Sequence, residues 1–74
     1  MGVWRLTEYT NGKIFRVEDY LSKPDAQYFM IKRYKGVLKS IISGVDKNEI
    51  NDLNAEIIFK NEIVYTWTIE NILE

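Results

Sequence analysis

The longest periodic pattern of apolar and polar positions spans residues 22–44 and predicts one amphipathic α-helix. When successive residues are spaced by about 100° around a helix axis, nearly all apolar side chains fall within one arc and the charged ones fall opposite. The apolar arc comprises Ala26, Met30, Ile31, Tyr34, Val37, Leu38, Ile41 and Ile42. Ser22 with Asp25 three positions later resembles a capping box, and Gly44 suits the left-handed position after the last turn. We therefore expect a long central helix whose apolar arc faces the core.

A β-hairpin is predicted before this helix, over residues 3–20. Asn11-Gly12 separates two runs rich in β-branched and aromatic residues, which is the strongest short signal for a two-residue hairpin turn. Such a turn pairs Leu6 with Val17 and fixes which side chains share a face. The face expected to point to the core carries Trp4, Leu6, Phe15 and Val17. The opposite face carries Val3, Tyr9, Ile14 and Tyr20 among charged residues.

A second hairpin is predicted after the helix, over residues 55–69, where the apolar positions alternate again. A three-residue turn at 60–62 pairs Phe59 with Ile63 and places the apolar side chains of both strands on one face. That face carries Ala55, Ile57, Phe59, Ile63, Tyr65, Trp67 and Ile69. Residues 45–54 are acidic and rich in asparagine, so we expect a loop there with at most one helical turn near residues 47–53.

The order of these elements predicts an α+β fold with a single domain over residues 1–74. We expect a ββαββ arrangement, in which a four-stranded antiparallel sheet has one long helix packed on one face. One helix covers one face only, so the other face is left to solvent or to a partner. The candidate partner-binding residues on this uncovered face are Val3, Tyr9, Ile14, Tyr20 and Val64.

Composition argues against an enzyme. The chain has no cysteine and no histidine, which excludes disulfides, thiolate nucleophiles, imidazole bases and the usual zinc ligands. A lysine could serve as a base in principle, but 74 residues leave little room for a recessed pocket. The acidic stretch from Asp46 fails the EF-hand template, because Asn51 stands where glycine is needed and Ile57 where glutamate is needed. We predict no catalytic residue, no metal and no cofactor.

The charges are unevenly distributed although the formal net charge is only −1. Residues 1–44 carry eight Lys/Arg and four Asp/Glu, whereas residues 45–74 carry two and seven. A chain with two poles of this kind can bind oppositely charged partners at either pole. No basic segment precedes a long apolar run, and no stretch approaches the ~20 apolar residues of a membrane span. We therefore expect a soluble, non-secreted, cytoplasmic protein that does not bind membranes.

The leading functional hypothesis is a small non-enzymatic protein that acts through a protein–protein interface. Its partner is another protein, with a second copy of the chain as one candidate. Isoleucine, lysine, asparagine and tyrosine are frequent, a bias typical of AT-rich genomes such as those of low-GC bacteria and their phages. This bias favours a phage or mobile-element accessory protein that inhibits a host nuclease or defence factor.

Two other surfaces of the predicted helix are alternatives. Nucleic acid could bind its basic face, which carries Lys32, Arg33, Lys35 and Lys39. Small residues at Gly36, Ser40 and Gly44 could also let another backbone approach closely, although a glycine without such a use is the more common case.

Overall fold

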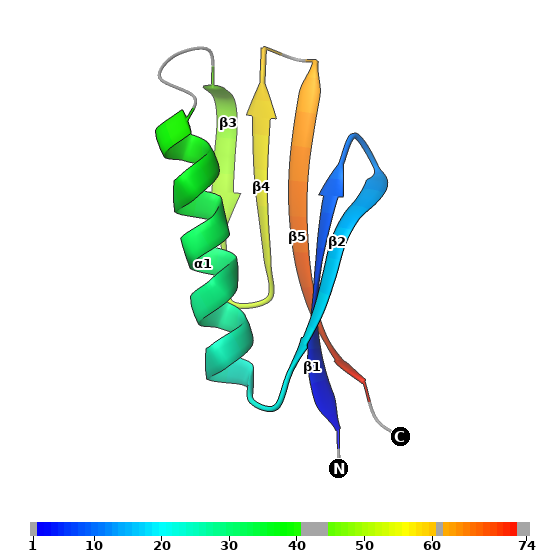
Figure 1. Ribbon diagram of the computed structural model, residues 1–74. Helices are drawn as coiled ribbons and strands as arrows, with labels where there is room; N and C mark the ends of the chain where they lie inside the picture. The colour runs from blue at the N-terminus through cyan, green and yellow to red at the C-terminus, as the bar shows by residue number, and fades with distance from the viewer. Residues whose placement is uncertain (1, 41–44, 61, 73–74) are drawn as a thin grey trace.

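Five antiparallel strands and one helix make up the part of the chain that the computed structural model describes, residues 2–40, 45–60 and 62–72. The elements are β1 (Val3–Thr10), β2 (Lys13–Tyr20), α1 (Lys23–Ser40), β3 (Val45–Ile50), β4 (Asn54–Phe59) and β5 (Ile63–Ile72). The strands form one sheet in the order β2-β1-β5-β4-β3, and α1 packs against one of its faces (Figure 1). The α+β fold is confirmed, with β5 at the centre of the sheet and β2 and β3 at its edges.

The helix begins where the capping pattern predicts. The Ser22 hydroxyl oxygen accepts a hydrogen bond of 3.3 Å from the backbone N–H of Asp25, which satisfies one of the donors at the open N-terminus. Ala26, Met30 and Tyr34, spaced four residues apart, are buried against the sheet. Residues 41–44, which the prediction included in the helix, lie outside the described residues. The helix in the described range is not long and apolar enough to cross a membrane.

The first hairpin has the predicted turn. Asn11 and Gly12 both take positive φ values, 52° and 81°, as a two-residue hairpin turn requires. Asn11 also fastens this turn to the central strand, because its backbone N–H donates to the carbonyl oxygen of Val64 and its side-chain oxygen accepts from the Val64 N–H, each at 2.8 Å. Tyr9 lies opposite Ile14, as predicted.

The pairing beyond Tyr9 differs from the prediction because a β-bulge shifts the register between Glu8 and Tyr9. Glu8 lies opposite Arg16 instead of Phe15, and Leu6 lies opposite Glu18 instead of Val17. One extra residue moves every later side chain of β2 to the other face, since side chains alternate along a strand.

Three predicted positions in β2 are therefore wrong. Phe15 and Val17, expected in the core, are 64% and 46% exposed. Tyr20, expected on the uncovered face, lies opposite Trp4 on the face that α1 covers and packs against the core.

The second hairpin has the predicted register. Phe59 lies opposite Ile63 and Ala55 opposite Trp67, so the apolar side chains of both strands share the face toward α1. Lys60 takes a positive φ of 53° in the turn, and the N–H of Glu62 donates to the carbonyl of Phe59 at 3.0 Å. Residue 61 lies outside the described residues.

The prediction of a loop at residues 45–54 is wrong, because β3 occupies most of that stretch and pairs with β4. Four of its six residues are polar, and all but Val45 are exposed. A turn stabilised by Asn51 joins the two strands: its side-chain oxygen accepts 3.0 Å hydrogen bonds from the N–H groups of Leu53 and Asn54. The sheet therefore has five strands in the described residues and not four.

The core lies between α1 and strands β1, β4 and β5. Its buried members are Leu6, Ala26, Met30, Tyr34, Ala55, Ile57, Trp67 and Ile69. Ile31, predicted within the apolar arc, is 39% exposed because it lies at the margin of that arc beside the β3–β4 turn. Figure 1 shows α1 starting beside the end of β2 and ending beside β3, so the helix crosses the sheet and the hairpin end of β2 lies away from it.

Candidate protein interface

The outer edge of β2 gathers exposed apolar side chains. Ile14, Phe15 and Val17 are 65%, 64% and 46% exposed, and Leu21, directly after the strand, is 81% exposed. We call these four residues the β2 edge. Because β2 pairs with β1 and with no other strand in the described part of the chain, its outward N–H and C=O groups have no strand partner there. An apolar strand at the edge of a sheet is a template for pairing with another chain.

The predicted partner-binding residues are only partly brought together. Tyr9 lies opposite Ile14 on β2 and Thr66 on β5, on the face away from α1. Val64, two positions before Thr66, faces the same side and extends this cluster onto β5. Val3 faces the same side as well, but at the other end of β1. Tyr9, Ile14 and Val64 therefore form one patch continuous with the β2 edge, and Val3 lies apart from it.

Much of the remainder of this uncovered face is polar, although Ile58 lies opposite Val64 and Ile72 opposite Val3. Arg5 binds Asp19 through two hydrogen bonds of 2.9 and 3.2 Å, and this hydrogen bonding to the guanidinium holds the pKa of Asp19 below its usual range. Lys47 lies 3.6 Å from Glu49 and 3.5 Å from Glu56. These charges are exposed and paired with one another, so this half of the face offers little apolar area to a partner.

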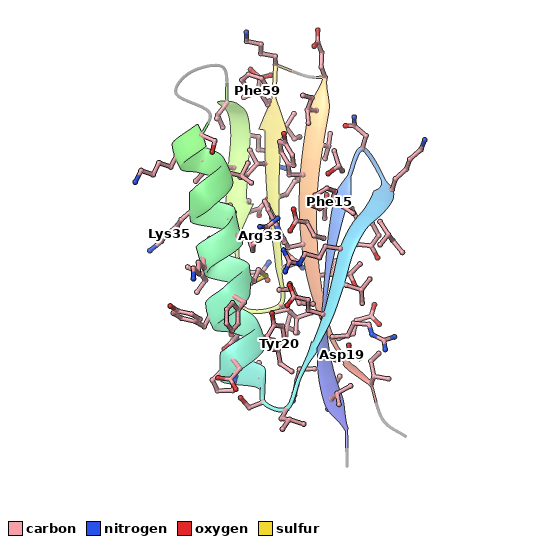
Figure 2. All side chains as sticks on the ribbon, in the orientation of Figure 1. Phe15, Asp19, Tyr20, Arg33, Lys35 and Phe59 are labelled. Atoms are coloured by element: carbon pink, nitrogen blue, oxygen red, sulfur yellow. The ribbon has the colours of Figure 1, made fainter. Side chains whose placement is uncertain are left out.

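Tyr20, the fifth predicted interface residue, is part of the helix–sheet contact. Figure 2 shows it between β2 and α1, where its ring stacks on Phe29 with centroids 5.1 Å apart. Its hydroxyl donates a 3.0 Å hydrogen bond to Glu18. Partial burial and this hydrogen bond raise the pKa of Tyr20 to about 12.

The raised pKa of Tyr20 predicts a loss of stability in alkali. Between pH 10, the ordinary value, and about 12 the folded protein keeps a proton that the unfolded chain has lost. The free energy of unfolding should therefore fall as the pH rises through this interval. Tyr20→Phe keeps the ring stack and removes the titrating hydroxyl, so its stability should fall less steeply. Urea unfolding across this range checks the difference, and equal slopes for the two proteins would contradict it.

A groove of about 610 Å³ separates α1 from β2 on the helix side of the sheet. Its lining consists of Arg16, Glu18, Phe29, Lys32, Arg33, Gly36, Val37, Ser40 and Tyr65. Glu8 on β1 is 5% exposed and accepts two hydrogen bonds of 3.0 and 3.2 Å from Arg33, one of the lining residues. This pairing raises the pKa of Arg33. Arg16 is likewise paired with Glu18, so both arginines of the groove are already occupied by carboxylates.

The four residues of the predicted nucleic-acid face do not act together, because Arg33 is paired with Glu8. Figure 2 shows Arg33 directed toward the sheet and Lys35 on the other side of the helix. The Lys32 ammonium lies 5.9 Å from the centre of the Phe29 ring, and Lys39 is exposed in the last turn. Three lysines remain on the outer arc, a smaller footprint for phosphate than the sequence predicted.

The small residues of α1 are not required by packing within the chain. A Cβ added at Gly36 would meet nothing within 4 Å. Ser40 donates a 3.0 Å hydrogen bond from its hydroxyl to the Gly36 carbonyl, which is a local contact within the helix. Gly44 lies outside the described residues, so the proposed stripe of three small residues is described only in part.

The residues that sequence reasoning missed are Phe15, Val17 and Leu21 on the β2 edge. Ile14-Phe15 is a break in the alternation of β2, and two adjacent apolar residues in a half-exposed strand are a signal for a bulge. That signal could have exposed the register shift.

The acidic β3–β4 segment holds no metal-binding geometry. Among residues 2–40, 45–60 and 62–72, no three Asp or Glu side chains come together as metal ligands. The backbone oxygen of Asp52 instead accepts a 3.0 Å hydrogen bond from the Gln27 side chain, which ties the turn to α1.

Comparisons with protein-family models, curated proteins and solved structures give no match for this chain, so no family or function is carried over from a relative.

Proposed function

We propose that this protein is a non-enzymatic binding module that pairs with another protein chain through its β2 edge. The observation that supports the proposal is the combination of exposed apolar side chains with an unpaired strand backbone on the same edge of the described sheet. In strand addition, the main chain of the partner supplies hydrogen bonds, and the side chains on alternate positions supply selectivity.

The β2 edge is favoured over the other exposed apolar residues because its members are adjacent. Leu53 in the β3–β4 turn is exposed too, but single apolar side chains are normal on a protein surface. Tyr28 on α1 is exposed and has its ring packed edge-on against that of Phe29. Burying the exposed parts of Phe15 and Val17, 64% and 46% of the two residues, would contribute about 2–3 kcal/mol to binding before the cost of association is subtracted. The patch of Tyr9, Ile14 and Val64 adds apolar area beside them.

The proposed mode of action is occupation of a surface, with no chemistry on the partner. Inhibition of a host nuclease or defence factor, in a phage or mobile element, stays a prediction from composition and size.

Affinity capture tests this function. Immobilised wild-type protein, a Phe15→Ser/Val17→Thr double variant and a Leu53→Ser control are incubated with the same lysate, and bound proteins are quantified by mass spectrometry. Leu53 is a suitable control because it is an exposed apolar residue in the β3–β4 turn, at the other side of the sheet from β2.

We expect partners that bind the wild type and the control but not the double variant. The captured partner is then purified and titrated by calorimetry against all three proteins, after circular dichroism has shown that each is folded. Binding that is equally strong for the double variant would overturn the proposal.

A further inference from the structure

We infer that the chain which pairs with the β2 edge is a second copy of this protein, joined antiparallel, β2 to β2, about a two-fold axis at Val17. This inference rests on the proposed function and names its partner. Two features of β2 support it: the order of its charges and the exposure of its apolar residues.

The charges of β2 are complementary to themselves. Arg16 and Glu18 flank Val17, and both side chains lie on the face toward α1, because their partners on β1 are Glu8 and Leu6. If Val17 lies opposite the partner's Val17, then Arg16 lies opposite the partner's Glu18, and Glu18 lies opposite the partner's Arg16. Two symmetric pairs of opposite charge result, and such directly opposed pairs stabilise antiparallel strands.

Neighbouring registers are less favourable. A shift by two residues in one direction places Arg16 opposite the partner's Arg16, and a shift in the other direction places Glu18 opposite the partner's Glu18. Like charges directly opposite one another are destabilising. A shift by one residue would place Val17, which faces away from α1, opposite a residue that faces toward α1 in the other copy. The two helices would then lie on opposite faces of the joined sheet. One register is therefore selected over the others.

The selected register also brings apolar residues of the edge together. Val17 of one copy lies opposite Val17 of the other, and such directly opposed pairs stabilise antiparallel strands. Phe15 is the extra residue of the bulge, so it has no partner on β1, but it is next to Arg16 and lies close to this contact.

The second edge of the sheet is less suited to this role. Ion pairs within the chain do not distinguish the two edges, because Lys47 lies 3.6 and 3.5 Å from Glu49 and Glu56 and Arg16 is likewise paired with Glu18. The apolar content does distinguish them. Ile50 is the one large exposed apolar residue of β3. Figure 1 shows the hairpin end of β2 at the edge of the sheet away from α1, while its other end leads into the helix.

Charge reversal tests the register directly. Arg16→Glu places two carboxylates opposite each other in both pairs, and Glu18→Arg places two guanidinium groups opposite each other. Each single variant should dimerise more weakly than the wild type by about tenfold or more, measured by sedimentation equilibrium. An equimolar mixture of the two variants restores opposite charges in both pairs, so it should form heterodimers. The double variant Arg16→Glu/Glu18→Arg should dimerise about as well as the wild type.

Lys35→Glu is the matched control, since it makes the same change of charge on the far side of α1 and should dimerise as the wild type does (Figure 2). Circular dichroism and urea unfolding show whether each variant is folded. Restoration in the mixture answers the objection that a single variant is merely unstable, because neither chain changes when the other is added.

Three outcomes would overturn the inference: a wild-type protein that is monomeric even at millimolar concentration, single variants that dimerise unchanged, or a mixture that forms no heterodimer. The proposed function has a separate outcome. It stands if another protein is captured in a manner that depends on Phe15 and Val17, even when the wild type is monomeric.

Discussion

Replacing Arg33 with alanine is expected to lower the free energy of unfolding by about 3 kcal/mol, because the Glu8 carboxylate then stays buried without a partner. The Glu8 side chain is 7% exposed, and the two hydrogen bonds from Arg33 are its ion-pair contact. Removing one member of a buried pair costs more than the pair itself contributes, since the remaining charge has lost its water. Urea unfolding at neutral pH measures the change.

Two further variants separate this explanation from a general effect of losing an arginine. Glu8→Gln leaves the guanidinium unpaired, but that side chain is 39% exposed and can be hydrated, so the loss should be less than half as large. Arg5→Ala breaks a contact of the same two-bond geometry with Asp19, on a surface exposed to water, and should have a smaller effect still. Equal losses for Arg33→Ala and Arg5→Ala would contradict the prediction.

Trp67→Ala is expected to cost about 4 kcal/mol of the free energy of unfolding. Trp67 has no exposed surface and lies in the central strand β5, with its ring 6.0 Å from that of Tyr34 and 6.4 Å from that of Tyr65. Truncation leaves a cavity between the helix and the sheet that the surrounding strands can close only in part. Thermal and urea unfolding followed by circular dichroism measure the effect.

Trp67→Phe is the informative companion variant. The indole N–H of Trp67 is buried and has no hydrogen-bond acceptor among the described residues. Phenylalanine removes this unsatisfied donor, which recovers about 1–3 kcal/mol of desolvation cost and offsets part of the smaller cavity. Its loss should be less than half that of Trp67→Ala. If both variants were equally unstable, the unsatisfied donor would have no energetic effect.

The helix and the second hairpin could be predicted because the spacing of their apolar side chains defines one buried face in each. Ala26, Met30 and Tyr34 recur at the spacing of one helical face, and Ser22 forms the cap that its position indicated. In the second hairpin, a long alternation of apolar residues and a short turn leave one register that buries Trp67.

The register of β2 and the presence of β3 could not be predicted, because both depend on backbone pairing that the pattern of apolar and polar residues indicates only weakly. The bulge opposite Glu8 is a single extra residue, yet it moved Phe15 and Val17 out of the core and Tyr20 into contact with it. β3 is an edge strand with both faces near solvent, so its pairing with β4 requires no apolar alternation. Val3, Tyr9, Ile14 and Val64 were placed on the correct face, because none of them lies beyond the bulge on β2.

The central position of β5 has a consequence for how the chain reaches its native state. Val3 is paired with Ile72, and Thr10 with Tyr65, so the two middle strands join segments from opposite ends of the described chain. Contacts so distant in sequence slow folding, because much of the chain loses freedom before they form. During synthesis, β1, β2 and α1 emerge before β5 exists to fill the space between β1 and β4. Both edges of that gap stay open until β5 has left the ribosome, so the nascent chain exposes the apolar side chains of its future core up to that point.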